Sequence, residues 1–113
     1  EFCKKKEVPV ICFPKGLKED YKSFVDIVKP NCISIDYEVD PKWAKENLKN
    51  ICIQGGMDPH LLLKNEKEAL KEVDKYLDIF KNNSYIFNLG HGVLPQTNPE
   101  IIRRIVNKIR KKK

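Results

Sequence analysis

The residue best placed to do chemistry in this sequence is a histidine that stands between two glycines. His91 follows the apolar run 85–89 through Gly90 and is followed at once by Gly92. Glycine tolerates backbone conformations closed to other residues and lets a ligand approach the main chain closely. We take His91 as the leading candidate for a functional side chain. An ordinary solvated surface histidine remains the alternative.

Other polar residues near the same kind of position are weaker candidates. Lys15 could clamp an anion or form a Schiff base, although a solvated lysine near a turn is the simpler interpretation. The carboxylates of Asp36 and Glu38, with Asp40 nearby, could serve acid–base work or bind a metal. Asp40 is better explained as a helix cap, which weakens that case. We expect His60 to be structural or solvated.

The four cysteines indicate a reducing environment. They lie 9, 20 and 20 residues apart, form no C-x-x-C pair, and fall in strand-like runs in three of four cases: Cys3, Cys12, Cys32, Cys52. Buried, reduced thiols that pack as small apolar groups explain this usage. A zinc site is the alternative, but the spacing fits no standard ligand pattern. We therefore predict a cytoplasmic protein.

Short apolar runs alternate with longer amphipathic ones along the whole chain. The predicted strands are 8–13, 32–36, 51–54 and 85–89. They are nearly continuous in apolar residues, as expected for parallel strands. Predicted helices follow them at 17–28, from 41 with Asp40 as N-cap, from 66 with a capping box of Asn65 and Glu68, and from 99. In the third helix we expect a core-facing stripe of Leu70, Val73, Leu77 and Phe80.

This alternation predicts an α/β fold with a parallel sheet. Two architectures satisfy it, a small open sandwich or half of a (β/α)8 barrel, and periodicity does not separate them. Both place ligands at the carboxyl ends of the strands, where His91 and Lys15 follow their runs.

The net charge of +6 does not indicate nucleic-acid binding. The basic residues are spread along the chain, and the one cluster, residues 108–113, has no aromatic residues among it to stack on bases. We interpret the cluster as a solvated helix end. We expect no membrane partner, because no run approaches the ~20 apolar residues of a membrane helix. The start without Met or an apolar leader suggests that an N-terminal part of a longer chain is missing.

Four segments, taken in order, carry a resemblance to a known family. They are Phe13-Pro14-Lys15-Gly16, Ser34-Ile35-Asp36-Tyr37, Ile53-Gln54-Gly55-Gly56-Met57-Asp58-Pro59, and Tyr85-Ile86-Phe87-Asn88-Leu89-Gly90-His91-Gly92-Val93-Leu94-Pro95 followed by Thr97-x-Pro99-Glu100. Together they resemble the uroporphyrinogen decarboxylases. Two positions depart from the family pattern: Tyr37 stands where it has tryptophan, and Gly56 where it has asparagine.

The resemblance implies a (β/α)8 (TIM) barrel of which residues 1–113 are the C-terminal half, its last four βα units. It implies removal of CO2 from the four acetate arms of uroporphyrinogen III to give coproporphyrinogen III in haem biosynthesis, without cofactor or metal. His91 matches the family's substrate-contacting histidine, so we assign it a hydrogen-bonding or proton-handling role near a substrate carboxylate. The family's arginine motif and pyrrole-binding aspartate have no counterpart here. We therefore expect the 113 residues alone to be inactive, and the full enzyme to be a homodimer.

Two other functions remain open. Corrinoid-linked methyltransferases of the same superfamily share the barrel, but they typically carry a zinc-binding cysteine where His91 stands. A naturally short interaction module is the non-enzymatic alternative. The missing Met and two unclosed strand edges argue against it.

Overall fold

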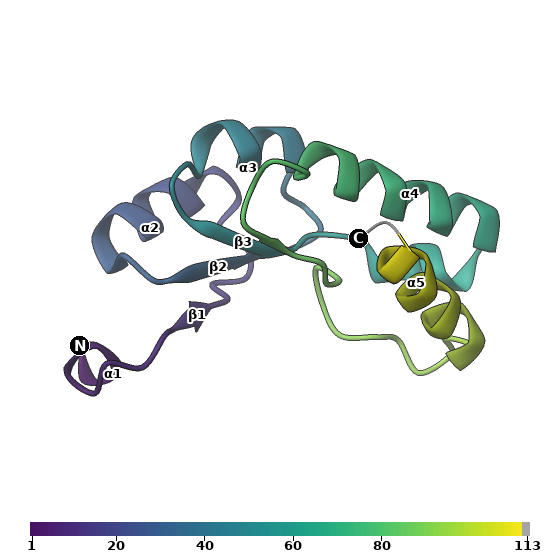
Figure 1. Cartoon of the computed structure of the whole chain (residues 1–113), viewed down its shortest axis with the longest axis horizontal. Helices are drawn as coiled ribbons and strands as arrows, with labels where there is room; N and C mark the ends of the chain where they lie inside the picture. The colour runs from purple at the N-terminus through teal and green to yellow at the C-terminus, as the bar shows by residue number, and fades with distance from the viewer. Residues whose placement is uncertain (112–113) are drawn as a thin grey trace.

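Four short strands lie side by side at the centre of the molecule (Figure 1). A computed structural model describes residues 1–111 and gives the strand order β1-β2-β3-β4, with every neighbouring pair parallel. The strands are β1 (Ile11–Cys12), β2 (Cys32–Ile35), β3 (Cys52–Gly55) and β4 (Tyr85–Ile86). Each successive strand is reached through a helical crossover, so the predicted parallel α/β fold is confirmed.

Five α-helices accompany the strands within residues 1–111. They are α1 (Phe2–Lys5), α2 (Tyr21–Val28), α3 (Pro41–Asn47), α4 (Glu66–Ile79) and α5 (Pro99–Lys111), with 3-10 turns η1 (Lys18–Asp20) and η2 (Pro59–Leu63). Figure 1 shows α2, α3 and α4 in a row on the same side of the strands. The sequence predicted all of these except α1 and η2, which are short and lack a long amphipathic pattern.

Local side chains fix where two helices begin. Asp40 accepts a hydrogen bond from the amide of Lys42 at 2.9 Å, with Pro41 in the first helical position. Asn65 accepts one from the amide of Lys67 at 2.8 Å. Both predicted N-caps are confirmed. The Asn65 bond goes to Lys67 and not to Glu68, so α4 begins with a simple cap and not with the predicted capping box.

The core lies between the sheet and the helices. Ile33, Ile35 and Ile53 point from the strands into it and are fully buried. On α4 the most buried side chains are Ala69, Val73, Tyr76 and Phe80. The predicted stripe is confirmed for Val73 and Phe80, while Leu70 and Leu77 pack against the core but are only partly buried. Ala69 allows close approach to the sheet, and Tyr76 can be buried because its hydroxyl has a hydrogen-bond partner.

Both edge strands are shorter than predicted. Of the predicted strands 8–13 and 85–89, only two residues each form a strand, whereas each of the two central strands has four residues. An edge strand pairs with only one neighbour, so its ends are held less firmly. After β4 the chain touches the sheet once more, through a single bridge between Met57 and Leu89.

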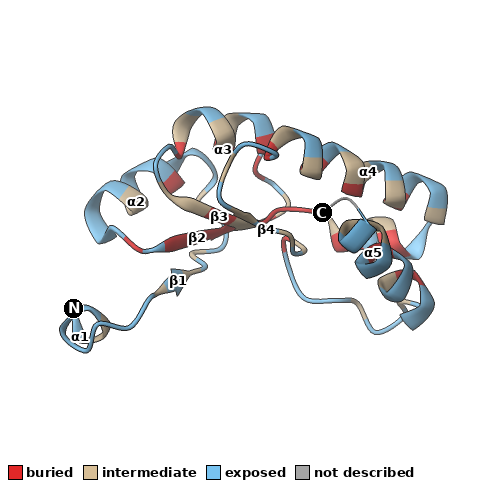
Figure 2. Ribbon diagram, in the orientation of Figure 1, coloured by how far each residue is buried: buried red, intermediate tan, exposed pale blue. Residues whose placement is uncertain are grey.

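Within residues 1–111, no helix lies across the second face of the sheet (Figure 1). Register places Ile11, Cys32 and Cys52 in one row across the strands, and Ser34, Gln54 and Ile86 in the next. Side chains alternate along a strand, so these rows face away from the core formed by Ile33 and Ile53. The side chains at both edges are exposed: Ile11 by 52% and Ile86 by 43%. Figure 2 shows the burial concentrated in β2, β3 and the inner sides of the helices.

The cysteines are free thiols of unequal burial. Cys32 is buried, while Cys3, Cys12 and Cys52 are partly buried. The prediction of buried thiols is therefore right in full only for Cys32. Burial, followed by the hydrogen bond with Cys52 on the next strand, raises the pKa of Cys32 to about 12.

The basic cluster at 108–113 only partly matches the predicted solvated helix end. Arg110 and Lys111 are exposed in the last turn of α5. Lys108 instead forms an ion pair with Asp74 of α4, with Nζ and Oδ2 3.1 Å apart. Residues 112–113 lie outside the described residues. Within 1–111, no helix has both the length and the apolar character to cross a bilayer.

Candidate functional site

The turns that leave the four strands gather at one edge of the sheet, because the strands are parallel. We call them the strand-end turns: residues 13–16 after β1, 36–38 after β2, 56–59 after β3 and 87–95 after β4. They contain all the residues that the sequence singled out as functional candidates except Asp40 and His60, which directly follow two of them. The geometry of these turns decides which candidates can act together.

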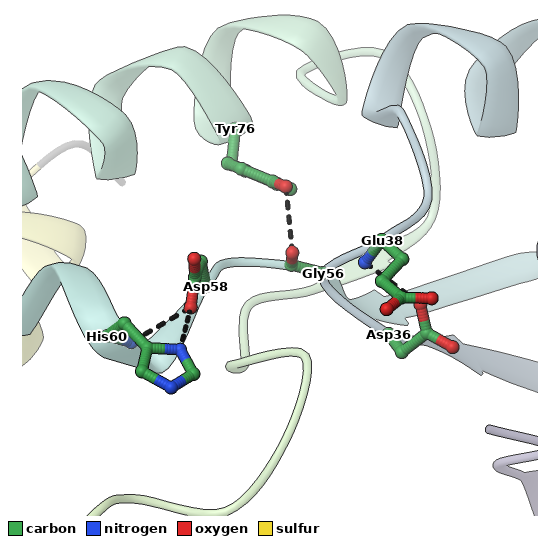
Figure 3. A network of polar contacts seen from close by, with 6 residues as sticks. All are labelled: Asp36, Glu38, Gly56, Asp58, His60 and Tyr76. Atoms are coloured by element: carbon green, nitrogen blue, oxygen red, sulfur yellow. Dashed lines mark hydrogen bonds and ion pairs between the residues drawn. The ribbon is translucent and has the colours of Figure 1, made fainter. Parts of the chain in front are cut away.

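Asp36 ties two of the strand-end turns together from inside the protein. Its side chain is nearly inaccessible, at 2% exposure. Its Oδ2 accepts hydrogen bonds from the amide of Gly16 at 2.6 Å and from the hydroxyl of Tyr21 at 3.0 Å. Its Oδ1 accepts one from the amide of Glu38 at 3.0 Å, a contact drawn in Figure 3. Three neutral donors thus compensate the buried carboxylate.

The three neighbouring acids therefore do not form a carboxylate pair for acid–base work. Asp36 points inward, Glu38 is exposed and contributes only its main-chain amide, and Asp40 caps α3. The buried partner of Asp36 also responds to it. Burial raises the pKa of the Tyr21 hydroxyl well above its usual value, and the negative charge of Asp36 raises it further.

The glycine pair at the end of β3 has a structural explanation. Gly55 and Gly56 both adopt positive φ, +86° and +106°. Their carbonyl oxygens accept hydrogen bonds from Tyr85 at 2.7 Å and Tyr76 at 2.8 Å, the latter visible in Figure 3. Only glycine adopts this backbone without strain, which explains the pair without a phosphate or nucleotide ligand.

Gly90, the residue before His91, is packed against the turn after β2. Its amide donates to the carbonyl of Met57 at 2.7 Å. A Cβ atom at this position would lie 2.8 Å from the carbonyl carbon of Asp36 and would also clash with the main chain of Tyr37. Glycine is thus required here by close approach and not by a positive φ. Gly92 has open space around it and shows no such requirement.

His91 itself lies exposed at this edge. His91 directly follows Gly90. The contact between Gly90 and the main chain of Asp36 and Tyr37 therefore fixes the main-chain position from which the His91 side chain extends. Lys15 is also exposed, on the turn whose Gly16 amide is bound by Asp36.

His60 has a partner that the sequence analysis did not anticipate. Its Nδ1 lies 2.7 Å from Oδ1 of Asp58, and the same oxygen accepts the His60 amide at 2.9 Å (Figure 3). The ring also meets Tyr37 edge-on at 5.6 Å between centroids. Asp58-Pro59 begins η2 as Asp40-Pro41 begins α3, and this repeated pattern was the available signal. The pair is a helix cap, so His60 keeps a structural assignment.

A metal centre finds no support in this arrangement. Within residues 1–111, histidine, cysteine, aspartate and glutamate nowhere assemble in a group of three or more that could hold a metal ion. Besides the exposed carboxylate of Glu38, the strand-end turns offer the exposed imidazole of His91, the exposed ammonium of Lys15 and main-chain N–H groups. Such groups suit the binding of carboxylates.

Fold and site together define a segment of a parallel α/β protein, in which the close contact of Gly90 places His91 at the edge of the sheet where the strand-end turns lie. A model of the uroporphyrinogen decarboxylase (URO-D) family matches residues 1–112, and the chain belongs to this family.

Curated relatives agree with this assignment. A protein named uroporphyrinogen decarboxylase from Wolbachia sp. subsp. Drosophila simulans (strain wRi) is 45% identical over 104 residues, which are 92% of this chain and 30% of the relative. One of the same name from Rhodobacter capsulatus is 37% identical over 106 residues, 92% of this chain and 31% of the relative. The chain therefore spans about three tenths of the length of these relatives.

Proposed function

We propose that this chain is a segment of a uroporphyrinogen decarboxylase, which removes CO2 from the four acetate arms of uroporphyrinogen III to give coproporphyrinogen III. The observation that carries the proposal is the family match over residues 1–112, which includes the turn holding His91. In each step a carboxylate leaves as CO2 and the remaining methylene carbon takes up a proton to become a methyl group. A protonated pyrrole of the substrate accepts the electron pair in between and releases its added proton once the methylene carbon is protonated, so the net uptake is one proton and the reaction needs neither cofactor nor metal.

The architecture we propose is a (β/α)8 barrel to which this chain contributes the last four βα units, its C-terminal part. The helix-free face of the sheet supports this, because its rows would become inward-facing layers of a barrel. The partly polar row Ser34, Gln54 and Ile86 suits such a position, with Gln54 donating to Ser34 at 3.4 Å. The 30% share of the relatives' length is less than the half expected from four units of eight. The other units would accordingly occupy a longer stretch of chain.

Within that barrel the strand-end turns would form part of the wall of the substrate pocket. We assign His91 a hydrogen bond to a substrate carboxylate or the handling of the proton that replaces CO2. Exposed Lys15 and the net charge of +6 would favour approach of a polyanionic substrate. The arginines and the pyrrole-binding aspartate of the family would come from the remaining part of the barrel. A homodimer in the cytoplasm, with no nucleic-acid or membrane partner, completes the proposal.

The test is steady-state kinetics of coproporphyrinogen formation by the full-length polypeptide, meaning these residues in their longer chain or joined to the amino-terminal part of the Wolbachia relative. We expect His91→Ala to lower kcat/KM by about 100-fold, the lower end of the effect of losing a positioned proton-transfer group. The matched control is His60→Ala, which removes the other histidine from a neighbouring turn and should retain parental kinetics.

Equal kinetics of His91→Ala and the parent would contradict the assigned role. Stoichiometric zinc in the purified full-length protein, together with absent decarboxylation, would favour the corrinoid-linked methyltransferases instead.

A further inference from the structure

We infer that Asp36 is the positioning residue that holds the turn of His91 in place, a role that rests on the proposed function and adds a second residue to it. Asp36 does not reach the substrate in this arrangement, because its side chain is 2% exposed. It acts through the strand-end turns that its side chain and main chain connect.

The side chain of Asp36 joins two turns and a helix. The amide of Gly16 belongs to the turn after β1, and the amide of Glu38 to the turn after β2. The hydroxyl of Tyr21, the first residue of α2, donates to the carboxylate and accepts from the Asp36 amide at 3.2 Å. These partners lie 20, 2 and 15 residues away in sequence. The carboxylate therefore fixes the turn on which its own main chain lies.

The main chain of Asp36 and Tyr37 supports the turn after β4. Gly90 lies so close to it that no side chain fits between them. On its other side Gly90 is bound to the carbonyl of Met57, in the turn after β3. A shift of the Asp36 turn therefore moves the surface on which Gly90 rests, and His91 is the next residue.

The chemistry of the carboxylate makes this connection specific. Its two oxygens face different donors: Oδ2 faces Gly16 and Tyr21, and Oδ1 faces Glu38. An asparagine has one oxygen and one NH2, so in either orientation an NH2 group would face a main-chain N–H. Asp36→Asn therefore releases one turn while it preserves side-chain size and leaves the core residues Ile33, Ile35 and Ile53 in place.

The experiment is a kinetic double-mutant cycle in the full-length polypeptide, with uroporphyrinogen III as substrate. We expect Asp36→Asn to lower kcat by 10- to 100-fold, with KM changed less than threefold, because small misplacements of a reacting group slow chemistry more than binding. In the His91→Ala background, Asp36→Asn should lower kcat by less than threefold further, since there is no imidazole left to position.

Two further variants make the test sharp. Asp40→Asn carries the same substitution four residues away, where asparagine caps a helix as well as aspartate does, so it should keep parental kcat. Gly90→Ala disturbs the same contact from the opposite side and should reproduce the kcat loss of Asp36→Asn. It also serves as the test if Asp36→Asn fails to fold, as judged by circular dichroism.

Parental kcat in folded Asp36→Asn and Gly90→Ala would overturn the inference, as would losses that multiply fully with that of His91→Ala, because these indicate a general structural effect. Failure of the proposed function looks different. In that case the parent itself forms no coproporphyrinogen, whatever residue 36 is.

Discussion

A buried thiol and a buried carboxylate show how differently single residues are accommodated in this sheet. Asp36 is surrounded by three donors, which satisfy the oxygens of its buried side chain. Cys32 is 4% exposed, and its thiol contacts the thiol of Cys52, so burial and this contact keep it protonated. Asp36 is therefore suited to hold the turns of the candidate site in place, and Cys32 is suited to pack in the protein interior.

The thiol of Cys32 should be nearly inert to alkylation. Burial raises its pKa to about 12, so at pH 8 its reactive thiolate is far rarer than that of an ordinary thiol. In the folded full-length polypeptide, we expect iodoacetamide to label Cys3 at least ~100-fold faster than Cys32, measured by peptide mass spectrometry. In denaturant the two should label alike.

The same pKa sets the sign of the pH dependence. The unfolded chain ionises this thiol near pH 9 and the folded chain near pH 12, so its contribution to stability is complete below pH 9 and declines as the pH rises toward 12. Rapid labelling of Cys32 in the native protein at pH 8 would show that the residue is not buried as described.

The role of a single residue could be predicted from the sequence when its hydrogen-bond partners lie close to it along the chain. The caps Asp40 and Asn65 were predictable, because each bonds an amide two residues ahead. The burial of Asp36 was not, because two of its three donors, Gly16 and Tyr21, come from 15 to 20 residues earlier. For His91 the flanking glycines suggested a special turn, but only the structure shows that Gly90 alone is required.

At the scale of elements, α4 is a helix whose first turn is capped by one side chain, that of Asn65. It is the longest helix of residues 1–111, with 14 residues, and it carries Tyr76, whose hydroxyl holds the glycine turn after β3. An ion pair between Arg104 and Glu66 fastens its first turn to α5. The side-chain cap from Asn65 satisfies an amide that would otherwise lack an intrahelical partner.

We expect Asn65→Ala to lower the free energy of unfolding of the full-length polypeptide by about 1 kcal/mol, the usual effect of removing such a cap. Asn65→Asp keeps the accepting oxygen and adds a negative charge at the helix N-terminus, so it should be as stable as the parent. Urea titration followed by circular dichroism measures both. Equal midpoints for Asn65→Ala and the parent would mean that α4 does not need this cap.

The elements were predictable where one strong pattern acted alone. Parallel strands at 32–36 and 51–54 were found nearly to the residue, since both are central and apolar. The edge strands were overestimated, because hydrophobic runs do not reveal how many neighbours a strand has. At two positions of α4 the most buried residue lies one place before the predicted one. Ala69 is buried because it is small, and Tyr76 because its hydroxyl has a hydrogen-bond partner, and the spacing of apolar residues shows neither.

At the scale of the whole molecule, the sheet is covered on one face and open on the other. Its two outer strands, β1 and β4, each have an unpaired edge within the described residues. A barrel would pair both edges and cover the open face with the side chains of the other strands. The candidate site would be completed by the same step, because the strand-end turns form only part of a ring.

The most direct test of this account is coproporphyrinogen formation by the parts and by the whole. The samples are this chain alone, the amino-terminal part of the Wolbachia relative alone, and the two joined in one polypeptide, each incubated with uroporphyrinogen III. We predict product only from the joined polypeptide, and a loss of about 100-fold when it carries His91→Ala. Decarboxylation by the 113-residue chain alone would contradict the account, as would a folded joined polypeptide that forms no product.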